Sequence, residues 1–187
     1  MISLREVVAS LYGAWRLARF DRSALGYFDS TPEGFWRSFF AALLAAPGDF
    51  TIQLLYSPAP LPDDLFRFAL VLVITYAFSW LIWPFTAVYL VRALGRNDAL
   101  FLYLTAHNWA QVIATLFQLA VAVVARGLLP AGFATLALLV SVVVVLGYEW
   151  FIATTALRID RLAASAVVTA YFVVTVLVSV IGTNLAG

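Results

Sequence analysis

Five long runs of apolar residues make up most of the chain, and short segments rich in polar residues, proline or glycine separate them. The runs cover about residues 32–56, 65–92, 99–125, 131–157 and 162–185. Each is longer than the ~20 residues with which a helix crosses a hydrocarbon core of ~30 Å. The runs lack the strict alternation of barrel strands. The pattern therefore predicts an all-α membrane protein with five transmembrane helices in one domain, 31–187.

Residues that favour helix starts and chain breaks stand at the ends of these runs. Thr31 fits the N-cap of the first span and is followed by a proline at the first helical position. The prolines in segment 57–62 prevent that helix from continuing, and Asp63 and Asp64 are suited to cap the next one. Asp160 is suited to cap the fifth span. These signals predict helix boundaries close to the edges of the apolar runs.

Residues 1–30 are expected to form a cytoplasmic amphipathic helix and a short connection. Apolar side chains recur there at helical spacing and predict one apolar face, made of Leu4, Val7, Val8, Leu11, Trp15 and Ala18. Such a helix lies in the membrane interface with this face in the lipid, or it packs on the protein's own cytoplasmic surface. The residues expected to contact lipid or a partner are Arg5, Trp15, Arg16 and Arg19.

The arginines predict the orientation of the chain in the membrane. Four stand in segment 1–30, two in segment 92–96 and two in segment 158–161, all on one side of the predicted helices. The opposite side has two, Arg67 and Arg126. Cytoplasmic loops carry the excess of basic residues. The N-terminus is therefore predicted inside and the C-terminus outside.

Composition narrows the class of protein further. Hydrophobic residues make up 64% of the chain and charged residues 11%, whereas soluble proteins average roughly a quarter charged residues. The net charge of +1 indicates no nucleic-acid partner, and a chain without cysteine forms no disulfide or thiolate metal site. All basic residues are arginine, which favours a GC-rich bacterial genome and hence a bacterial cytoplasmic (inner) membrane. We expect the bilayer as a partner and no cofactor.

Glu149 is the only charged residue in run 131–157. An ionisable side chain inside a membrane span is expected to have a partner and indicates a functional site. In adjacent antiparallel helices, Glu149 and His107 lie at the same depth, ~12 Å from the cytoplasmic helix ends at ~1.5 Å per residue. Residues near this plane form a predicted polar cluster, which contains His107, Asn108, Gln111, Tyr148, Glu149 and Tyr171.

Two interpretations of this cluster stay open. A histidine beside a carboxylate can take up and release a proton near neutral pH. Alternatively, the pair is a hydrogen bond that joins two helices, worth about 1 kcal/mol or less in a membrane. Tryptophans near the same level, Trp83, Trp109 and Trp150, are typical of an interface, so Glu149 either lies buried in the bundle or lines a cytoplasmic vestibule; helix length does not decide, because tilt accommodates a long span. The pair alone is no metal signature, because the chain has no further His or Cys.

Asp49 is a second charge within a span, in the predicted outer half of the first helix. It follows Pro47, and both Pro47 and Pro84 of the second span predict helix kinks. Thr115 and Gln118 lie at comparable depth and are the expected partners of the carboxylate. Asp49 is expected to have a structural or interfacial role, or to lie on an ion pathway.

The sequence carries no motif of a known catalytic site. It has no phosphate-binding loop, dinucleotide-binding glycine pattern, zinc-protease helix or nucleophile elbow. Small hydroxyl residues are common where membrane helices meet, so we expect packing roles for Ser38, Ser79, Ser141, Ser165 and Ser179. The chain is therefore not expected to be an enzyme.

Two local segments stand out: Leu94-Gly95-Arg96-Asn97 and, in the third span, His107-Asn108-Trp109-Ala110-Gln111. Together with the predicted topology, they resemble the bacterial Yip1-like membrane proteins. The resemblance covers the topology of most of the chain and, locally, residues 94–114. That family often has a small-polar-proline segment where this chain has His-Asn-Trp. The resemblance implies a non-enzymatic membrane protein; eukaryotic relatives bind small GTPases and other membrane proteins in vesicle traffic.

Two functions are therefore expected. The first is a Yip1-like protein that organises membranes or binds lipids, other membrane proteins or itself. The alternative is a small proton-linked transporter or channel that uses the plane of His107 and Glu149. A water-accessible cavity that reaches Glu149 from the cytoplasm favours transport, and a closed contact without a cavity favours the interaction protein.

Overall fold

The computed structural model describes residues 2–57 and 64–186, of which nearly all are helical. Helix accounts for 89% of the residues, and no strand occurs among the described ones. The elements are α1 (Leu4–Ala18), η1 (Arg22–Tyr27), α2 (Pro32–Ser38), α3 (Phe40–Tyr56), α4 (Leu65–Ala93), η2 (Asn97–Ala99), α5 (Leu100–Leu128), α6 (Ala131–Leu157) and α7 (Arg161–Ala186). The predicted break at 58–62 and the predicted cap Asp63 lie outside the described residues.

Five helical segments are long and apolar enough to cross a membrane, as the sequence predicted. They are α2 with α3, α4, η2 with α5, α6, and α7. The expected caps begin three of them. The side chain of Thr31 accepts from Gly34 N at 3.0 Å, that of Asp64 from Arg67 N at 2.9 Å and that of Asp160 from Ala163 N at 2.8 Å. The chain is therefore a multi-pass membrane protein.

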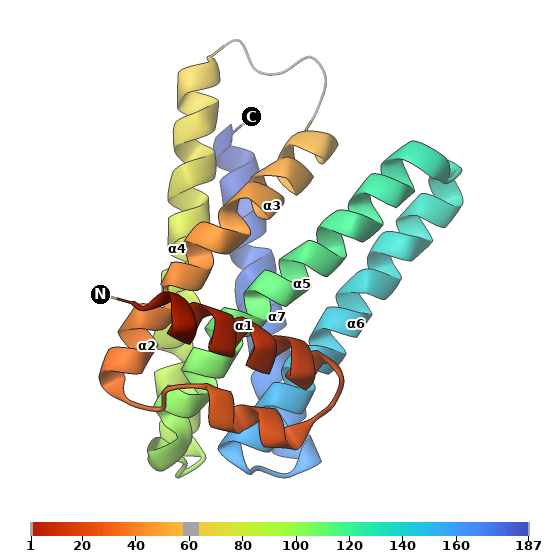
Figure 1. Ribbon diagram of the computed structural model, residues 1–187. Coiled ribbons are helices and arrows are strands. Elements are labelled where there is room, and N and C mark those ends of the chain that lie inside the picture. The colour runs from red at the N-terminus through yellow and green to blue at the C-terminus, as the bar shows by residue number, and fades with distance from the viewer. Residues whose placement is uncertain (1, 58–63, 187) are drawn as a thin grey trace.

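Helix α5 is the centre of the bundle and contacts α1, α2, α3 and α6, while α4 packs chiefly on α7 (Figure 1). Helix α1 crosses the bundle near the end that holds the α4–α5 and α6–α7 turns, which we call the α1 end. The α5–α6 pair leans away from α4 and α7 toward the opposite end, which we call the far end. The helices therefore lie closest together at the α1 end.

The first span is interrupted at Phe39, earlier than the predicted kink at Pro47. Helix α3 continues through Pro47, whose missing N–H leaves the carbonyl of Leu43 without its helical donor. The next residue, Gly48, lies close to α5, because a Cβ on it would be 2.7 Å from Cγ2 of Thr115. Gly48 thus permits the close contact of α3 with α5. Helix α4 likewise continues through Pro84.

Helix α1 packs on the bundle through a face that overlaps only in part with the predicted one: Val7 is buried, and Leu11 and Ala18 are partly buried against the core. Its buried residues are Val7, Ser10, Gly13, Ala14 and Leu17, and they face α5, α6 and η1. Of the predicted apolar face, Leu4 is 79%, Val8 58% and Trp15 53% exposed. Small residues allow close approach between helices, so Ser10, Gly13 and Ala14 bring α1 close to the bundle, and Val7 and Leu17 fill the contact on either side of them.

Some arginines near the N-terminus, including Arg16 that was expected to contact lipid or a partner, bind carboxylates of the protein itself. Arg16 forms an ion pair with Asp21 and donates to Tyr27 Oη at 3.1 Å. Arg37 forms ion pairs with two carboxylates, that of Glu6 at 2.8 Å and that of Asp29. Hydrogen bonds from Thr31 and the charge of Arg37 hold the pKa of Asp29 below its usual value. Arg5 and Arg19 are exposed and remain available to lipid headgroups.

Replacing Tyr148 by phenylalanine should loosen α1. The Tyr148 hydroxyl donates to the carbonyl of Ala14 at 2.7 Å, in a buried contact. Loss of that bond should cost about 1 kcal/mol. The variant should unfold at a lower temperature in detergent, and trypsin should cleave faster at the arginines of α1. The same change at Tyr89, which is 71% exposed, is the control, and equal cleavage of both variants would contradict this anchoring role.

Candidate functional site

His107 of α5 and Glu149 of α6 form a buried contact. Nδ1 of His107 lies 2.8 Å from Oε2 of Glu149, and the side chains are 5% and 2% exposed. Gln111, one turn along α5, donates from Nε2 to the other carboxylate oxygen at 2.8 Å. Both oxygens of Glu149 therefore have partners on α5. Residues four apart share a helix face, which explains how α5 supplies both.

Tyr171 of α7 extends this contact to a third helix. Its hydroxyl donates to Oε1 of Gln111 at 3.4 Å, and its ring centroid lies 5.2 Å from that of His107. Trp83 of α4 lies beside both rings, at 5.1 Å from Tyr171 and 5.9 Å from His107. We call His107, Gln111, Glu149 and Tyr171 the His107 cluster.

Two residues predicted for this cluster bond elsewhere. Nδ2 of Asn108 donates to Ser38 Oγ at 2.8 Å and ties α5 to α2. Tyr148 bonds the backbone of α1, as described above. Each is adjacent in sequence to a cluster residue, and adjacent residues on a helix point about 100° apart. Equal depth therefore did not imply a shared face.

A proton added to the ring of His107 would rearrange the hydrogen bonds of the cluster. When Nδ1–H of His107 donates to Glu149, the Nε2 of a neutral ring carries a lone pair, and Nε2 of Gln111 lies 3.4 Å from it. Protonation of that ring nitrogen would place two donors face to face. The amide of Gln111 would then have to turn its oxygen toward the ring, giving up its bond to Glu149. A proton on His107 is thus coupled to the hydrogen bonds of α6 and α7.

A cavity of about 690 Å³ extends from the His107 cluster between α3, α4, α5 and α7. Trp83, His107, Gln111 and Tyr171 line its inner part. Its other end is marked by Ser57, which follows α3, and by Thr183 of α7. Those two residues belong to the far end of the bundle, where α3 and α7 finish. The space therefore leads from the far end to the middle of the bundle.

Polar side chains at a spacing of about four residues line this cavity. On α7 they are Tyr171, Thr175, Ser179 and Thr183, and on α5 they are His107, Gln111, Thr115 and Gln118. Helix α4 contributes Thr75 and Ser79, and α3 contributes Asp49 and Gln53. Ser79 and Ser179, which we expected to pack between helices, thus line the cavity. The spacing is visible in the sequence and is the signal that sequence reasoning missed.

Of the two placements that the sequence left open for Glu149, a buried site and a cytoplasmic vestibule, the structure has the buried one. Glu149 is 2% exposed and does not line the cavity, which ends at the His107 cluster. Toward the α1 end, Tyr103 and Leu104 are buried in the core. Trp83 and Trp109 are also almost fully buried, so they do not form an exposed interfacial belt. The carboxylate lies inside the bundle, and the cavity extends from the cluster toward the far end.

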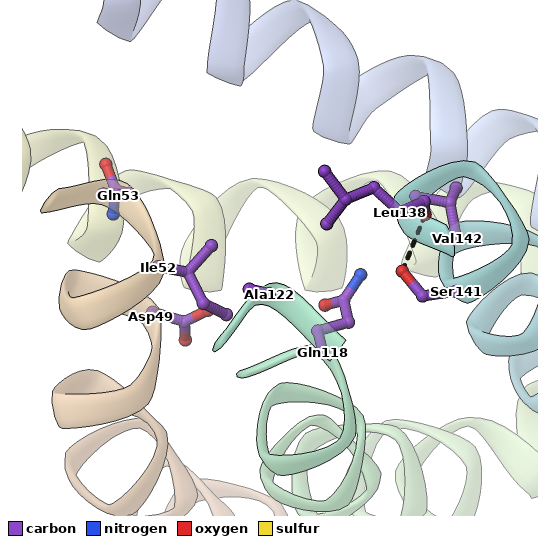
Figure 2. A pocket seen from close by; sticks show the side chains of 8 residues that line it. All are labelled: Asp49, Ile52, Gln53, Gln118, Ala122, Leu138, Ser141 and Val142. Atoms are coloured by element: carbon purple, nitrogen blue, oxygen red, sulfur yellow. Dashed lines mark hydrogen bonds between the residues drawn. The ribbon is translucent and has the colours of Figure 1, made fainter. Parts of the chain in front are cut away.

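Asp49 lies on the wall of the cavity, closer to its far end. The Thr115 hydroxyl, one of the two expected partners, contacts its carboxylate oxygens at 3.3 and 3.4 Å. Gln118, the other expected partner, lines the same spaces as Asp49 but is not bonded to it in the described contacts. Figure 2 shows Asp49 and Gln118 around a smaller pocket of about 190 Å³ between α3, α5 and α6. The carboxylate thus borders two spaces.

Neither carboxylate belongs to a metal site in the described part of the chain, where no three His, Asp or Glu side chains come together. The arrangement offers instead a hydrogen-bonded histidine–carboxylate pair at the end of a polar cavity. Comparisons with protein-family models, with curated proteins and with solved structures found no match. The resemblance to Yip1-like proteins therefore stays a prediction from sequence.

Proposed function

We propose that the protein is a small proton-linked transporter of a polar solute. The observation that supports this best is the polar cavity inside an otherwise apolar bundle, ending at the His107 cluster. Polar groups that face each other inside a membrane span are costly unless they meet water, a solute or one another. A bundle with a purely structural His–Glu bond needs no such space beside it. The cavity is therefore the binding site in this proposal.

The His107 cluster supplies the coupling between proton and solute. It forms the inner end of the cavity, so a solute there contacts His107, Gln111 or Tyr171. Movement of a proton on or off His107 changes the bonds of Gln111 to Glu149 and Tyr171, and hence the contacts among α5, α6 and α7. The tightly packed α1 end is the gate that opens in the alternate state. A solute or a proton shifts the equilibrium between the two conformations by binding to one of them better.

We place the α1 end on the cytoplasmic side of a bacterial inner membrane. The arginine-rich turns meet at this end, where Arg96 donates to the carbonyl of Arg158 at 2.9 Å. The excess of arginine at this end supports the assignment. The cavity then opens toward the outside.

Proton movement in reconstituted vesicles tests the transport function. Vesicles with an entrapped pH-sensitive dye receive a solute gradient from a panel of amines, amino acids and sugars. At least one class should change the internal pH faster than in protein-free vesicles. A wild-type protein that moves protons with no solute class, and moves no solute under an imposed pH gradient, would overturn the proposal.

A second candidate function, binding of the membrane surface by the N-terminal segment, is favoured by the outer face of α1. Leu4, Val8, Tyr12 and Trp15 form an exposed apolar stripe, each at least 50% exposed. Exposed apolar stripes with neighbouring arginines are typical of interfacial helices. This role fits the Yip1-like interaction protein expected from the sequence, and it is compatible with transport.

A fluorophore on α1 tests this contact. An NBD label on Val8→Cys should emit at shorter wavelength in vesicles than the same label on Arg22→Cys, because position 8 would lie in lipid. Arg22 is exposed in η1, outside the stripe. Identical, water-like emission from both labels would exclude membrane contact by the stripe.

A further inference from the structure

We propose that the cavity binds an organic ammonium ion, held between the Asp49 carboxylate and the aromatic side chains of α4 and α7. This names the substrate class of the proposed transport site and rests on that function. Three observations carry it: the charges on the cavity wall, the lack of a counterion for Asp49, and the aromatic lining.

The fixed charge of the cavity wall is negative. Among the described residues that line the space, Asp49 is the only acidic one, and no arginine lines it. His107 is the only basic side chain there, and it already faces the buried carboxylate of Glu149. An anionic solute would meet Asp49 without a cation to offset it. A cationic solute would meet a complementary charge.

Asp49 has no cation partner in the described part of the chain. Its hydrogen-bond partner there is the hydroxyl of Thr115, at 3.3 and 3.4 Å, which is at the long end for such bonds. The side chain is partly buried within a membrane span. A charge in such a place is costly unless it is paired. A bound cation would provide the missing partner.

The aromatic lining favours an organic cation over a metal ion. Tyr76, Trp80, Trp83 and Tyr171 line the cavity, and ring faces attract ammonium groups. The Tyr76 hydroxyl donates to the carbonyl of Ala42 at 2.6 Å, which holds that ring in place beside Trp80. A metal ion needs several oxygen ligands, whereas the described residues have no group of three ionisable ligands. The volume of about 690 Å³ suits a small organic molecule.

Equilibrium binding of choline to the purified protein in detergent tests this inference. The neutral isostere 3,3-dimethylbutan-1-ol has the same shape without the charge. We expect saturable choline binding by the wild-type protein and binding of the isostere that is weaker by about tenfold or more. Asp49→Asn should weaken choline binding by about tenfold, and Asp49→Glu, which keeps the charge, should largely preserve it.

The control variant is Asp64→Asn. Asp64 caps α4 at the far end and does not line the cavity, so choline binding should be unchanged. No saturable choline binding by the wild-type protein, equal affinity for the isostere, or full binding by a folded Asp49→Asn protein would each overturn the inference. The comparison of choline with its isostere needs no variant, so it remains decisive if Asp49→Asn fails to fold.

The binding result and the vesicle result separate the two proposals. Choline binding without any solute-linked proton movement would refute transport and support an ammonium site. Proton movement driven by a sugar, in a protein that does not bind choline, would support transport and refute the ammonium site.

Discussion

Replacing Glu149 by glutamine should reduce solute-driven proton movement to the level of protein-free vesicles. Glutamine has nearly the shape of glutamate, and its oxygen can still accept from Nδ1–H of His107. It carries no charge, however, so a proton on His107 is no longer stabilised by a carboxylate 2.8 Å away. The variant therefore keeps the hydrogen bond to His107 but loses the negative charge beside it, which the proposed coupling requires. The measurement is the initial rate of internal pH change after solute addition.

The same chemical change at an exposed site is the matched control. Glu33 stands in the first turn of α2, away from the cavity, and Glu33→Gln should transport as the wild type does. Glu149→Leu should lose transport as well, and it should also lose stability, by about 1 kcal/mol or more, because His107 and Gln111 are left without their acceptor. Full proton movement by the Glu149→Gln protein would show that the pair only joins helices.

Cysteines placed on the cavity side of α7 should react with membrane-impermeant thiol reagents. The natural chain has no cysteine, so each single substitution reports its own site. Thr175 and Ser179 line the cavity and are exposed to it. Thr175→Cys and Ser179→Cys should therefore be labelled nearly completely, because water in the cavity ionises the thiol to its reactive thiolate. The readout is the mass of the protein after labelling in intact membranes.

A lipid-facing position on the same helix supplies the control. Leu177 is 55% exposed and does not line the cavity, so Leu177→Cys should stay unlabelled in the membrane and react once the protein is denatured. Reagent added from outside the cell should label the cavity positions if the far end is external, as the arginines predict. Equal labelling at positions 177 and 179 would contradict a water-filled cavity.

The spans, their caps and the His107–Glu149 contact could be predicted from the sequence. An apolar run longer than a bilayer needs admits few structures other than a helix, because an unpaired backbone polar group is costly in lipid. Thr31, Asp64 and Asp160 capped the expected helices because capping depends on local chain geometry. The contact followed from counting residues along adjacent antiparallel helices.

The packing of α1 could not be predicted, because this helix has apolar residues on more than one face. A hydrophobic pattern favoured the side with the larger residues, Leu4, Val8 and Trp15. The structure buries Val7 of that predicted face together with Gly13, Ala14 and Leu17, and leaves Leu4, Val8 and Trp15 exposed. The choice depends on the shape of α5 and α6, which a single helix does not reveal.

The sequence by itself determined that the chain crosses a membrane with five helices and that Glu149 shares a level with His107. Only the tertiary structure decided that Asn108 and Tyr148 bond elsewhere, and that the polar stripes of four helices border one cavity. The physical reason is that lipid is as apolar as a neighbouring helix, so hydrophobicity does not specify which face of a span meets which partner. Those pairings depend on side-chain shape and hydrogen bonds between distant segments, such as the close approach of Gly48 to Thr115.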